Sequence, residues 1–285
     1  MENQKELYTN LTALFNCKDN TVSGDRFKVL MNKEYEMLVT FPVPADLESY
    51  YKSETYISHT DSKKSFFDKI YQGVKNHTLK QKLILLNSFK NKGNSVLDFG
   101  AGTGDFLKVC KNNSWAVLGI EPSEAARENA AKKGIHLKES LSDVSNQKFD
   151  VITLWHVLEH VADLKSTIET LKGLLEPGGR IIVAVPNYKS YDATFYKEHW
   201  AAYDVPRHLW HFSQKAIHKL FSEVEMVVVK TLPMKFDSYY VSLLSEKYKT
   251  GKSNPIKAFY RGFLSNWKAR NTTEYSSLIY ILKND

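Results

Sequence analysis

Hydrophobic positions in the middle of the chain follow two alternating patterns, short apolar runs and stripes at three- and four-residue steps. The runs lie at residues 95–99, 115–120, 135–138, 149–155 and 180–185, and the stripes between them at residues 104–111, 123–133 and 157–175. Short uninterrupted apolar runs are typical of strands that are buried on both faces. Their alternation with helices predicts a doubly wound parallel sheet with right-handed crossovers.

The segments on either side of this core add a hairpin and further helices. Residues 62–89 carry a long helical stripe, and residues 1–45 carry short mixed patterns around turn signals. Residues 224–232 and 276–282 are rich in β-formers and are expected to pair at one sheet edge, with an inserted, mainly helical arm at 239–274 between them. The expected fold is a seven-stranded, mainly parallel, Rossmann-like α/β sheet with an antiparallel edge hairpin. A helical N-terminal extension would occupy residues 1–62, and one domain with its inserted arm would occupy residues 63–285.

Composition excludes several classes of protein. With 42% hydrophobic and 13% aromatic residues among 285, the chain can bury a core, which disordered and low-complexity chains cannot. Two cysteines exclude a disulfide scaffold and a four-thiolate zinc site. Because no apolar stretch reaches the length of a signal peptide or a membrane helix, a reducing, cytoplasmic setting is expected.

The net charge of +7 is unevenly distributed along the chain. Residues 95–235 hold 17 basic and 17 acidic groups, whereas residues 239–274 hold seven basic and two acidic groups. The neutral centre coincides with the predicted sheet. The basic arm, with its aromatic residues, indicates an anionic acceptor or a membrane surface, beside the usual interpretation of a solvated helix face.

A glycine-rich loop follows the first apolar run of the sheet. It reads Asp98-Phe99-Gly100-Ala101-Gly102-Thr103-Gly104, and its three glycines allow a tight turn and close approach of a ligand. A phosphate-binding P-loop would need Lys-Ser or Lys-Thr next, but Asp105-Phe106 follows. Asp105 stands where a dinucleotide fingerprint needs glycine, at a helix N-terminus that should meet a pyrophosphate. The acid Asp98 instead suits a cationic ligand.

A second acid ends the next apolar run, in Gly119-Ile120-Glu121-Pro122-Ser123. Glu121 follows Asp98 at about the 20-residue separation at which a carboxylate holds a ribose diol. The predicted ligand therefore has a ribose, a positive charge and no phosphates. S-adenosylmethionine has these three properties.

These segments resemble those of a known family. Residues 96–104 are similar to motif I of the class I S-adenosylmethionine-dependent methyltransferases, and residues 119–123 resemble their acidic ribose loop. The strand at 149–152, the segment at 155–161 and the helix stop at 174–179 match in order, and residues 185–213 resemble the ubiquinone-biosynthesis-like branch. The resemblance covers residues 95–235. Many relatives carry a cysteine-paired metal-binding knuckle near the N-terminus, but Cys17 stands alone here, so no metal is expected.

The resemblance implies an S-adenosylmethionine site whose residues can be named. The methionine part of the cofactor would meet the first residues of the glycine loop, Glu121 would hold the ribose, and the adenine would lie near Ser140 and Leu141. Trp155 and His156 would lie beside the transferred methyl group. The predicted cofactor-binding residues are Asp98, Gly100, Ala101, Gly102, Gly104, Glu121, Pro122, Ser140, Leu141, Trp155 and His156.

The predicted reaction is methyl transfer to a small-molecule or a lipid- or glycan-linked acceptor, more at oxygen than at carbon or nitrogen. A hydroxyl acceptor must lose a proton, and histidine suits that task at neutral pH. His208 is the first candidate base, followed by His211 and His156. Structural alternatives remain open for each: His208, for example, could make only a structural hydrogen bond. Candidate acceptor-binding residues are Tyr56, His59, Trp200, Arg207 and Tyr239.

Three other functions remain as alternatives. A methyltransferase-like fold without catalysis would act as a binding module, and an NAD-linked oxidoreductase is disfavoured by Asp105. A nucleic-acid methyltransferase is disfavoured because Val185-Pro186-Asn187-Tyr188 is not the tetrad of base amino-methyltransferases.

Overall fold

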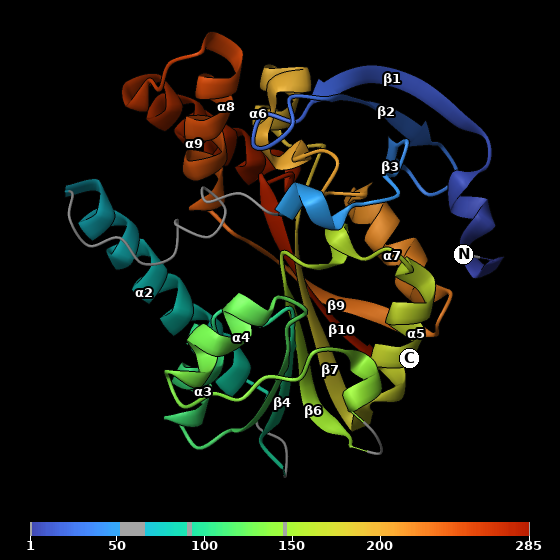
Figure 1. Ribbon diagram of the computed structural model, residues 1–285, viewed down its shortest axis with the longest axis vertical. Helices are drawn as coiled ribbons and strands as arrows, with labels where there is room; N and C mark the ends of the chain where they lie inside the picture. Colours follow the sequence, from blue (N-terminus) through green and yellow to red (C-terminus); the bar gives the residue numbers. More distant parts are fainter. Residues whose placement is uncertain (1, 52–65, 90–92, 145–146, 285) are drawn as a thin grey trace.

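A six-stranded mixed sheet forms the centre of the computed structural model, which describes residues 2–51, 66–89, 93–144 and 147–284 (Figure 1). The strand order is β5-β4-β6-β7-β10-β9. The strands are β4 (Ser95–Phe99), β5 (Ala116–Ile120), β6 (Phe149–Trp155), β7 (Leu175–Pro186), β9 (Met226–Pro233) and β10 (Ser277–Asn284). β5, β4, β6 and β7 are parallel, whereas β10 runs antiparallel to both β7 and β9. The predicted parallel sheet with an antiparallel edge hairpin is therefore confirmed.

The predicted count of seven strands is wrong by one. Residues 135–138, expected to be the third strand, meet β5 only in the single bridge between Ile120 and Lys138. Two backbone hydrogen bonds join them, from Glu121 N to Lys138 O and from Lys138 N to Gly119 O. The segment is too short to continue the ladder before the turn at Ser140.

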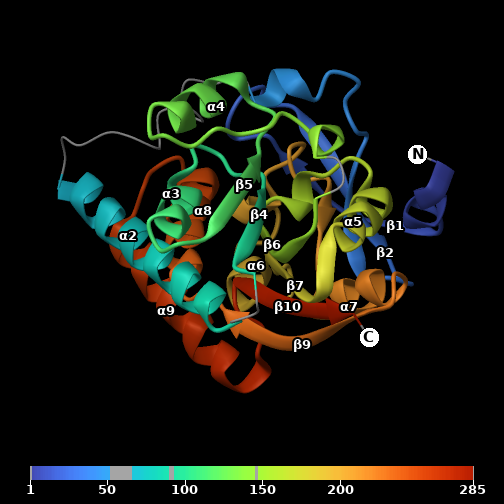
Figure 2. The ribbon, with the colours of Figure 1, turned by 90° about the horizontal axis from the view of Figure 1, so that it is seen from below.

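Helices cover both faces of this sheet (Figure 2). One face packs against α2 (Phe66–Asn87) and α3 (Asp105–Lys111), and the other against α5 (Leu164–Gly173) and α7 (Gln214–Ser222). Successive residues of β4 show the alternation, since Val96 belongs to the first core and Leu97 to the second. The helix α4 (Glu124–Ala131) lies after β5, and its N-terminus is capped by the Ser123 hydroxyl.

The apolar stripe at residues 157–175 forms two helices rather than one. A single turn, η4 (Leu158–His160), is separated from α5, which begins after the cap residue Asp163. β7 begins at Leu175 and includes Pro177-Gly178-Gly179, which were expected to lie before the strand. The pairing of β6 with β7 shifts register between Phe149 and Val151, so the start of β7 is irregular.

The N-terminal extension is mainly β-structure, which corrects the expected helical extension. After the turn η1 (Glu2–Tyr8), the strands β1 (Leu11–Lys18), β2 (Arg26–Asn32) and β3 (Met37–Phe41) form an antiparallel sheet that β8 (Trp210–His211) completes. Phe27 and Val29 are buried whereas Arg26 and Lys28 are exposed, the period-two pattern of a half-buried strand. The buried Cys17 has no cysteine partner among the described residues.

The inserted arm is helical, as expected, and contains α8 (Asp237–Thr250) and α9 (Pro255–Thr272). It joins β9 to β10, and Figure 1 shows the two helices projecting together at one corner of the molecule. Within the described residues, no helix has the length and hydropathy needed to cross a membrane. The division at residues 62/63 stays a prediction because residues 52–65 lie outside the described part of the chain.

Candidate functional site

The glycine-rich loop connects β4 to α3 at the carboxyl edge of the parallel strands. Gly100, Gly102 and Gly104 all have positive φ, at 76°, 52° and 73°. A Cβ on Gly100 would lie 2.4 Å from Val157 Cγ2, so glycine is required there for packing as well as for conformation. A Cβ on Gly102 would meet no atom within 4 Å, so the middle of the loop faces open space.

Glu121, at the end of β5, is held against this loop. Its Oε2 accepts a hydrogen bond from Gly102 N at 2.9 Å, and its Oε1 accepts one from Ser123 N at 3.0 Å. The two amides fix a half-buried carboxylate at the point where β4 and β5 end side by side. Pro122 follows it, and Ala101 N donates to Ile120 O at 2.8 Å, which ties the loop to β5.

Asp98 is buried at the end of β4, with 3% of its surface exposed. Thr153 Oγ1 donates to Asp98 Oδ1 at 2.6 Å. Burial raises the pKa of this carboxyl to about 6, although the Thr153 hydrogen bond and the positive charge of Lys82 act in the opposite direction. The cationic neighbour expected for Asp98 is thus partly supplied by the chain itself.

Lys82, which is not among the predicted site residues, projects from α2 into the same region. Its ammonium lies 4.2 Å from the ring centroid of Trp155, which ends β6, and 5.8 Å from that of Phe106. Burial lowers the pKa of Lys82 to about 8, against the attraction of Asp98 and Asp237. The feature of the sequence that could have indicated this residue is a lysine within the apolar stripe of α2.

Asp105, which was expected to disfavour a dinucleotide, is not an isolated anion. Lys75 and Lys133 lie 2.6 and 2.7 Å from its two carboxylate oxygens. Burial would raise its pKa, but the hydrogen bonds from these lysines outweigh that effect and lower it. The two positive charges compensate the carboxylate, so Asp105 does not by itself disfavour a pyrophosphate.

Ser140 and Leu141 lie just beyond the bridge that joins Lys138 to β5. Asp143 Oδ2 accepts hydrogen bonds from Ser140 N and Ser140 Oγ, so this turn is closed on itself. Leu141 is half-buried against the core. Their position near Glu121 is compatible with the predicted adenine contact, which stays a prediction.

His156 lies immediately after β6, between two carboxylates. Its Nε2 is 3.0 Å from Asp237 Oδ2, at the start of α8, and its Nδ1 is 3.4 Å from Glu159 Oε1. Burial disfavours the charged ring, but the Asp237 and Glu159 carboxylates on either side outweigh this and raise its pKa to about 10. His156 is therefore a cation at neutral pH, which disfavours it as a proton acceptor. Asp237, missed in the sequence, links the inserted arm to the site.

Replacing His156 with glutamine is expected to destabilise the protein in a pH-dependent way. Since the folded-state pKa, about 10, lies above the ordinary value of 6.5, the ion pairs stabilise the fold fully below about pH 6.5. That contribution is lost as the pH rises through 10. The free energy of unfolding, measured by urea denaturation from pH 6 to 10, should show a gap between wild type and His156→Gln that closes with rising pH. A gap independent of pH would contradict the ion-pair assignment.

Glu159, His160 and His208 form a compact group next to His156. One ligand atom from each lies within 4.8 Å of the others. Nδ1 of His160 lies 3.0 Å from Arg207 O, and Nδ1 of His208 lies 2.8 Å from Ala202 O. If both Nδ1 atoms donate to these carbonyls, both Nε2 atoms carry accepting lone pairs.

The Glu159 carboxylate completes this group as a buried anion. Burial would raise its pKa, but the close approach of His156 and the nearby histidines lower it to about 2. Neither carboxylate oxygen has a hydrogen-bond partner of normal geometry in the described part of the chain. The candidate ligand atoms lie within 4.8 Å of one another, and zinc bond lengths of about 2 Å correspond to ligand atoms roughly 3.3 Å apart. The expected absence of a metal stays a prediction.

His211 lies in β8, in the smaller sheet, and is buried. Its Nε2 is 3.0 Å from Thr40 Oγ1, and its ring packs edge-on against Tyr203. Burial and the neighbouring His208 lower its pKa to about 3. These contacts favour a structural role for His211 over its predicted role as a base.

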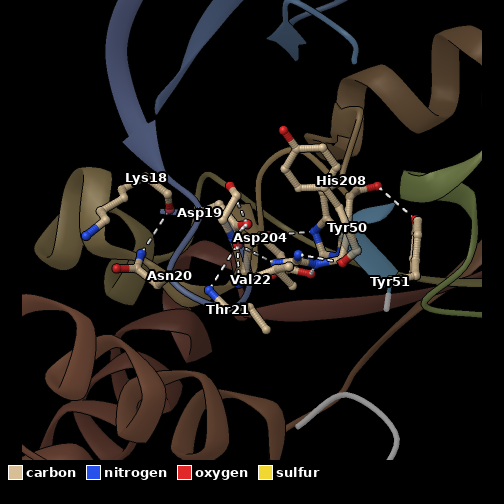
Figure 3. A network of polar contacts seen from close by, with 12 residues as sticks. Lys18, Asp19, Asn20, Thr21, Val22, Tyr50, Tyr51, Asp204 and His208 are labelled. Atoms are coloured by element: carbon tan, nitrogen blue, oxygen red, sulfur yellow. Dashed lines mark hydrogen bonds and ion pairs between the residues drawn. The ribbon is translucent and has the colours of Figure 1, made fainter. Parts of the chain in front are cut away.

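Arg207 is fully buried and joins the N-terminal sheet to the loop before β8. It makes two hydrogen bonds to Asp204, one to Asp19 Oδ1 at 3.0 Å and one to Tyr50 O at 3.0 Å. Figure 3 shows Asp19, Asp204 and Tyr50 close to one another in this network of polar contacts. An arginine with all these partners has little capacity left for an acceptor, so the geometry does not favour its predicted role in acceptor binding.

The other predicted acceptor-binding residues are dispersed. Trp200 is 2% exposed and its Nε1 donates to Asp192 Oδ2 at 2.8 Å, a core contact. Tyr239 lies on α8 two residues beyond Asp237, stacked at 5.1 Å on Phe259 of α9. Tyr56 and His59 lie outside the described residues.

Comparison with known families identifies residues 71–231 as matching the profile of a methyltransferase domain. This match covers more than half of the chain and includes β4, β5, β6, β7 and the loop that carries His208.

Two curated relatives illustrate the similarity in sequence. The ubiquinone biosynthesis O-methyltransferase of Coxiella burnetii is 30% identical over 111 residues, 35% of this chain and 47% of that protein. The protein of the same name from Actinobacillus pleuropneumoniae is 37% identical over 109 residues, 33% of this chain and 47% of that protein. The chain thus spans about half the length of these relatives.

Among solved structures, the magnesium protoporphyrin IX methyltransferase of Synechocystis PCC 6803, determined with bound SAH, superimposes with a TM-score of 0.55. The match covers 83% of this chain and 97% of that one at 16% identity, so it supports the fold alone.

Proposed function

This chain belongs to the methyltransferase-domain family, and from that premise we propose that it is an S-adenosylmethionine-dependent O-methyltransferase acting on a small-molecule acceptor. The observation that carries the proposal is the carboxylate of Glu121 held by two backbone amides beside the open, positive-φ Gly102. A carboxylate at this strand end is suited to accept hydrogen bonds from two ribose hydroxyls.

The residues at the loop fit S-adenosylmethionine as a group. Glu121 would hold the ribose, and the buried Asp98 would attract the positive charge of the methionine part. Lys82, over the face of Trp155, would meet the methionine carboxylate. When bound, the cofactor supplies a methyl group on a sulfonium that is its own leaving group.

The chain's part in the reaction is to orient the acceptor and to remove its proton. We assign removal of the acceptor's proton to His208 Nε2, because Nδ1 of that ring is hydrogen-bonded to Ala202 O. The ionised Glu159 nearby would stabilise the resulting imidazolium. His156, as a cation, would stabilise negative charge on an anionic acceptor or on the developing oxyanion.

The acceptor class we propose is an anionic, hydroxylated small molecule, free or lipid-linked. The curated relatives are named as O-methyltransferases, and the arm that flanks the site carries a basic excess. Contact of the arm with a membrane surface is a separate proposal. The cytoplasmic location stays a prediction.

His208→Asn should slow methyl transfer by about 10²-fold or more, the usual contribution of a positioned base, while leaving the affinity for S-adenosylhomocysteine unchanged. The asparagine amide can still donate to Ala202 O but has no counterpart of Nε2. The assay follows a deuterated methyl group from S-adenosylmethionine onto a panel of catechol carboxylates and prenylated phenols by mass spectrometry. His218→Asn, on the exposed side of α7, is the matched control.

Three results would overturn parts of this proposal. Label on nitrogen or carbon alone would refute O-methylation, and cofactor binding without transfer to any acceptor would favour the inactive binding module. Activity lost on chelation and restored by a divalent ion would replace the base role of His208 with a metal held by Glu159, His160 and His208.

A further inference from the structure

Helix α9 presents its large apolar residues to solvent and its small residues to the protein. The inward positions, Ala258, Ser265 and Ala269, are at most 2% exposed, and Gly262 is buried as well. The outward positions are 49% to 84% exposed and comprise Ile256, Phe259, Tyr260, Phe263 and Trp267. Their spacing of three and four residues places them along one face of the helix. A helix that serves only the core of a globular protein has the opposite arrangement.

This orientation is fixed by close packing rather than by loose attachment. A Cβ on Gly262 would lie 2.8 Å from Tyr239 Cδ1 and 2.9 Å from Tyr239 Cα, so α8 and α9 touch at their backbones. Ser238 Oγ donates to Gly262 O at 3.1 Å, and Ser265 Oγ donates to the buried Asp192 at 2.6 Å. A rotation of α9 that buried its aromatic face would break these contacts.

The charged residues of α9 itself are all positive. α9 carries Lys257, Arg261, Lys268 and Arg270 and no acidic residue. The acids of the arm are engaged elsewhere: Asp237 lies against His156, Glu246 is 4% exposed and accepts a hydrogen bond from Tyr196 OH, and Glu274 accepts one from Asn187 Nδ2. Aromatic and aliphatic side chains flanked by lysine and arginine form the pattern of a helix that lies in the interface of an anionic bilayer.

We propose that α9 is an interfacial helix that docks the protein on an anionic lipid surface. A second copy of the chain fits this face less well, because pairing two such helices would bring eight positive charges together without acids to offset them. Exposed Phe and Trp side chains, together with lysines and arginines that can contact anionic headgroups, suit a lipid surface.

The docking surface is connected to the candidate site. Tyr239 stacks on Phe259 at 5.1 Å, and two residues earlier on α8, Asp237 lies 3.0 Å from His156. Docking through α9 would therefore hold the site next to the bilayer, where a lipid-linked acceptor resides. This last step rests on the proposed function, whereas the docking itself does not.

Cosedimentation of the full chain with vesicles tests the docking. The wild type should bind phosphatidylcholine vesicles containing phosphatidylglycerol. It should bind vesicles of pure phosphatidylcholine, or the anionic vesicles at high salt, much more weakly. The triple variant Phe259→Ser, Phe263→Ser, Trp267→Ser should lose at least about tenfold in partitioning. The matched control replaces three exposed apolar residues elsewhere, Leu14→Ser, Ile84→Ser and Val229→Ser, and should bind as the wild type does.

The outcomes separate docking from catalysis. If the wild type ignores anionic vesicles, or if the α9 variant binds as well as the control, the proposal is wrong. Reversible self-association that the α9 variant abolishes, without vesicle binding, would assign the face to a second copy and would also refute it. Affinity for S-adenosylhomocysteine should be the same in all three proteins. If none of them binds it, the proposed function fails while the vesicle result stands.

Discussion

Replacing Arg207 with methionine is expected to lower the free energy of unfolding by about 3 kcal/mol, the lower part of the range for breaking a buried ion pair by removing one partner. The guanidinium is fully buried, and its loss leaves the carboxylates of Asp19 and Asp204 without their cation. The lower part of the range applies for two reasons. Asp19 keeps hydrogen bonds from the amides of Thr21 and Ser23, and the Asp204 side chain is 22% exposed.

Guanidinium denaturation measures this effect against a matched surface pair. Lys189 and Glu36 form an ion pair at 2.6 Å with side chains 38% and 32% exposed. Lys189→Met should cost no more than about 1 kcal/mol, because exposed pairs contribute little. If Arg207→Met is as mild as Lys189→Met, Arg207 does not tie the N-terminal sheet to the domain, and its predicted role in acceptor binding regains support.

Replacing Glu121 with alanine is expected to weaken binding of S-adenosylhomocysteine by roughly 10- to 150-fold, corresponding to about 1.5 to 3 kcal/mol for hydrogen bonds to a charged group. The carboxylate stands between the Gly102 and Ser123 amides, and its removal takes away both the acceptor for a ribose diol and a tie that shapes the loop. Glu121→Gln keeps one acceptor oxygen, so its affinity for S-adenosylhomocysteine should lie between those of the wild type and Glu121→Ala.

The control for Glu121 is Glu128→Ala, which removes an exposed acid from the neighbouring α4. Calorimetry should give it the affinity of the wild type. The free energy of unfolding of each variant shows whether Glu121→Ala acts through the ligand or by loosening the loop. Unchanged affinity in Glu121→Ala would remove the residue from the cofactor site.

The order of strands and helices in the sheet follows from the sequence because each element carries its own period. The apolar runs of β4 and β6 are buried on both faces, and the hairpin β9–β10 is rich in β-branched residues. The N-terminal sheet was missed because β1 is mostly exposed and the apolar run Ala13-Leu14-Phe15 interrupts the alternation of apolar and polar residues. Its fourth strand, β8, comes from residues 210–211, and no local pattern reveals a pairing between segments so far apart in the chain.

Some residues of the candidate site can be predicted from local sequence patterns, whereas others are brought there by contacts between distant segments. The glycine loop and Glu121 follow from a strand-turn-helix pattern within a short segment. Lys82, Asp237 and the pairing of Glu159 with His208 depend on α2, α8 and the 204–208 loop meeting at the end of β6. The sequence marks His208 as a candidate but does not reveal that Arg207 beside it points to Asp19.

Isothermal titration of the wild-type chain with S-adenosylhomocysteine shows whether the glycine loop and Glu121 form a cofactor site. We expect saturable binding of one ligand per chain, weakened by Glu121→Ala and unchanged by Glu128→Ala. If a chain that unfolds cooperatively gives no binding heat and no competition by S-adenosylmethionine, it does not have the proposed cofactor site.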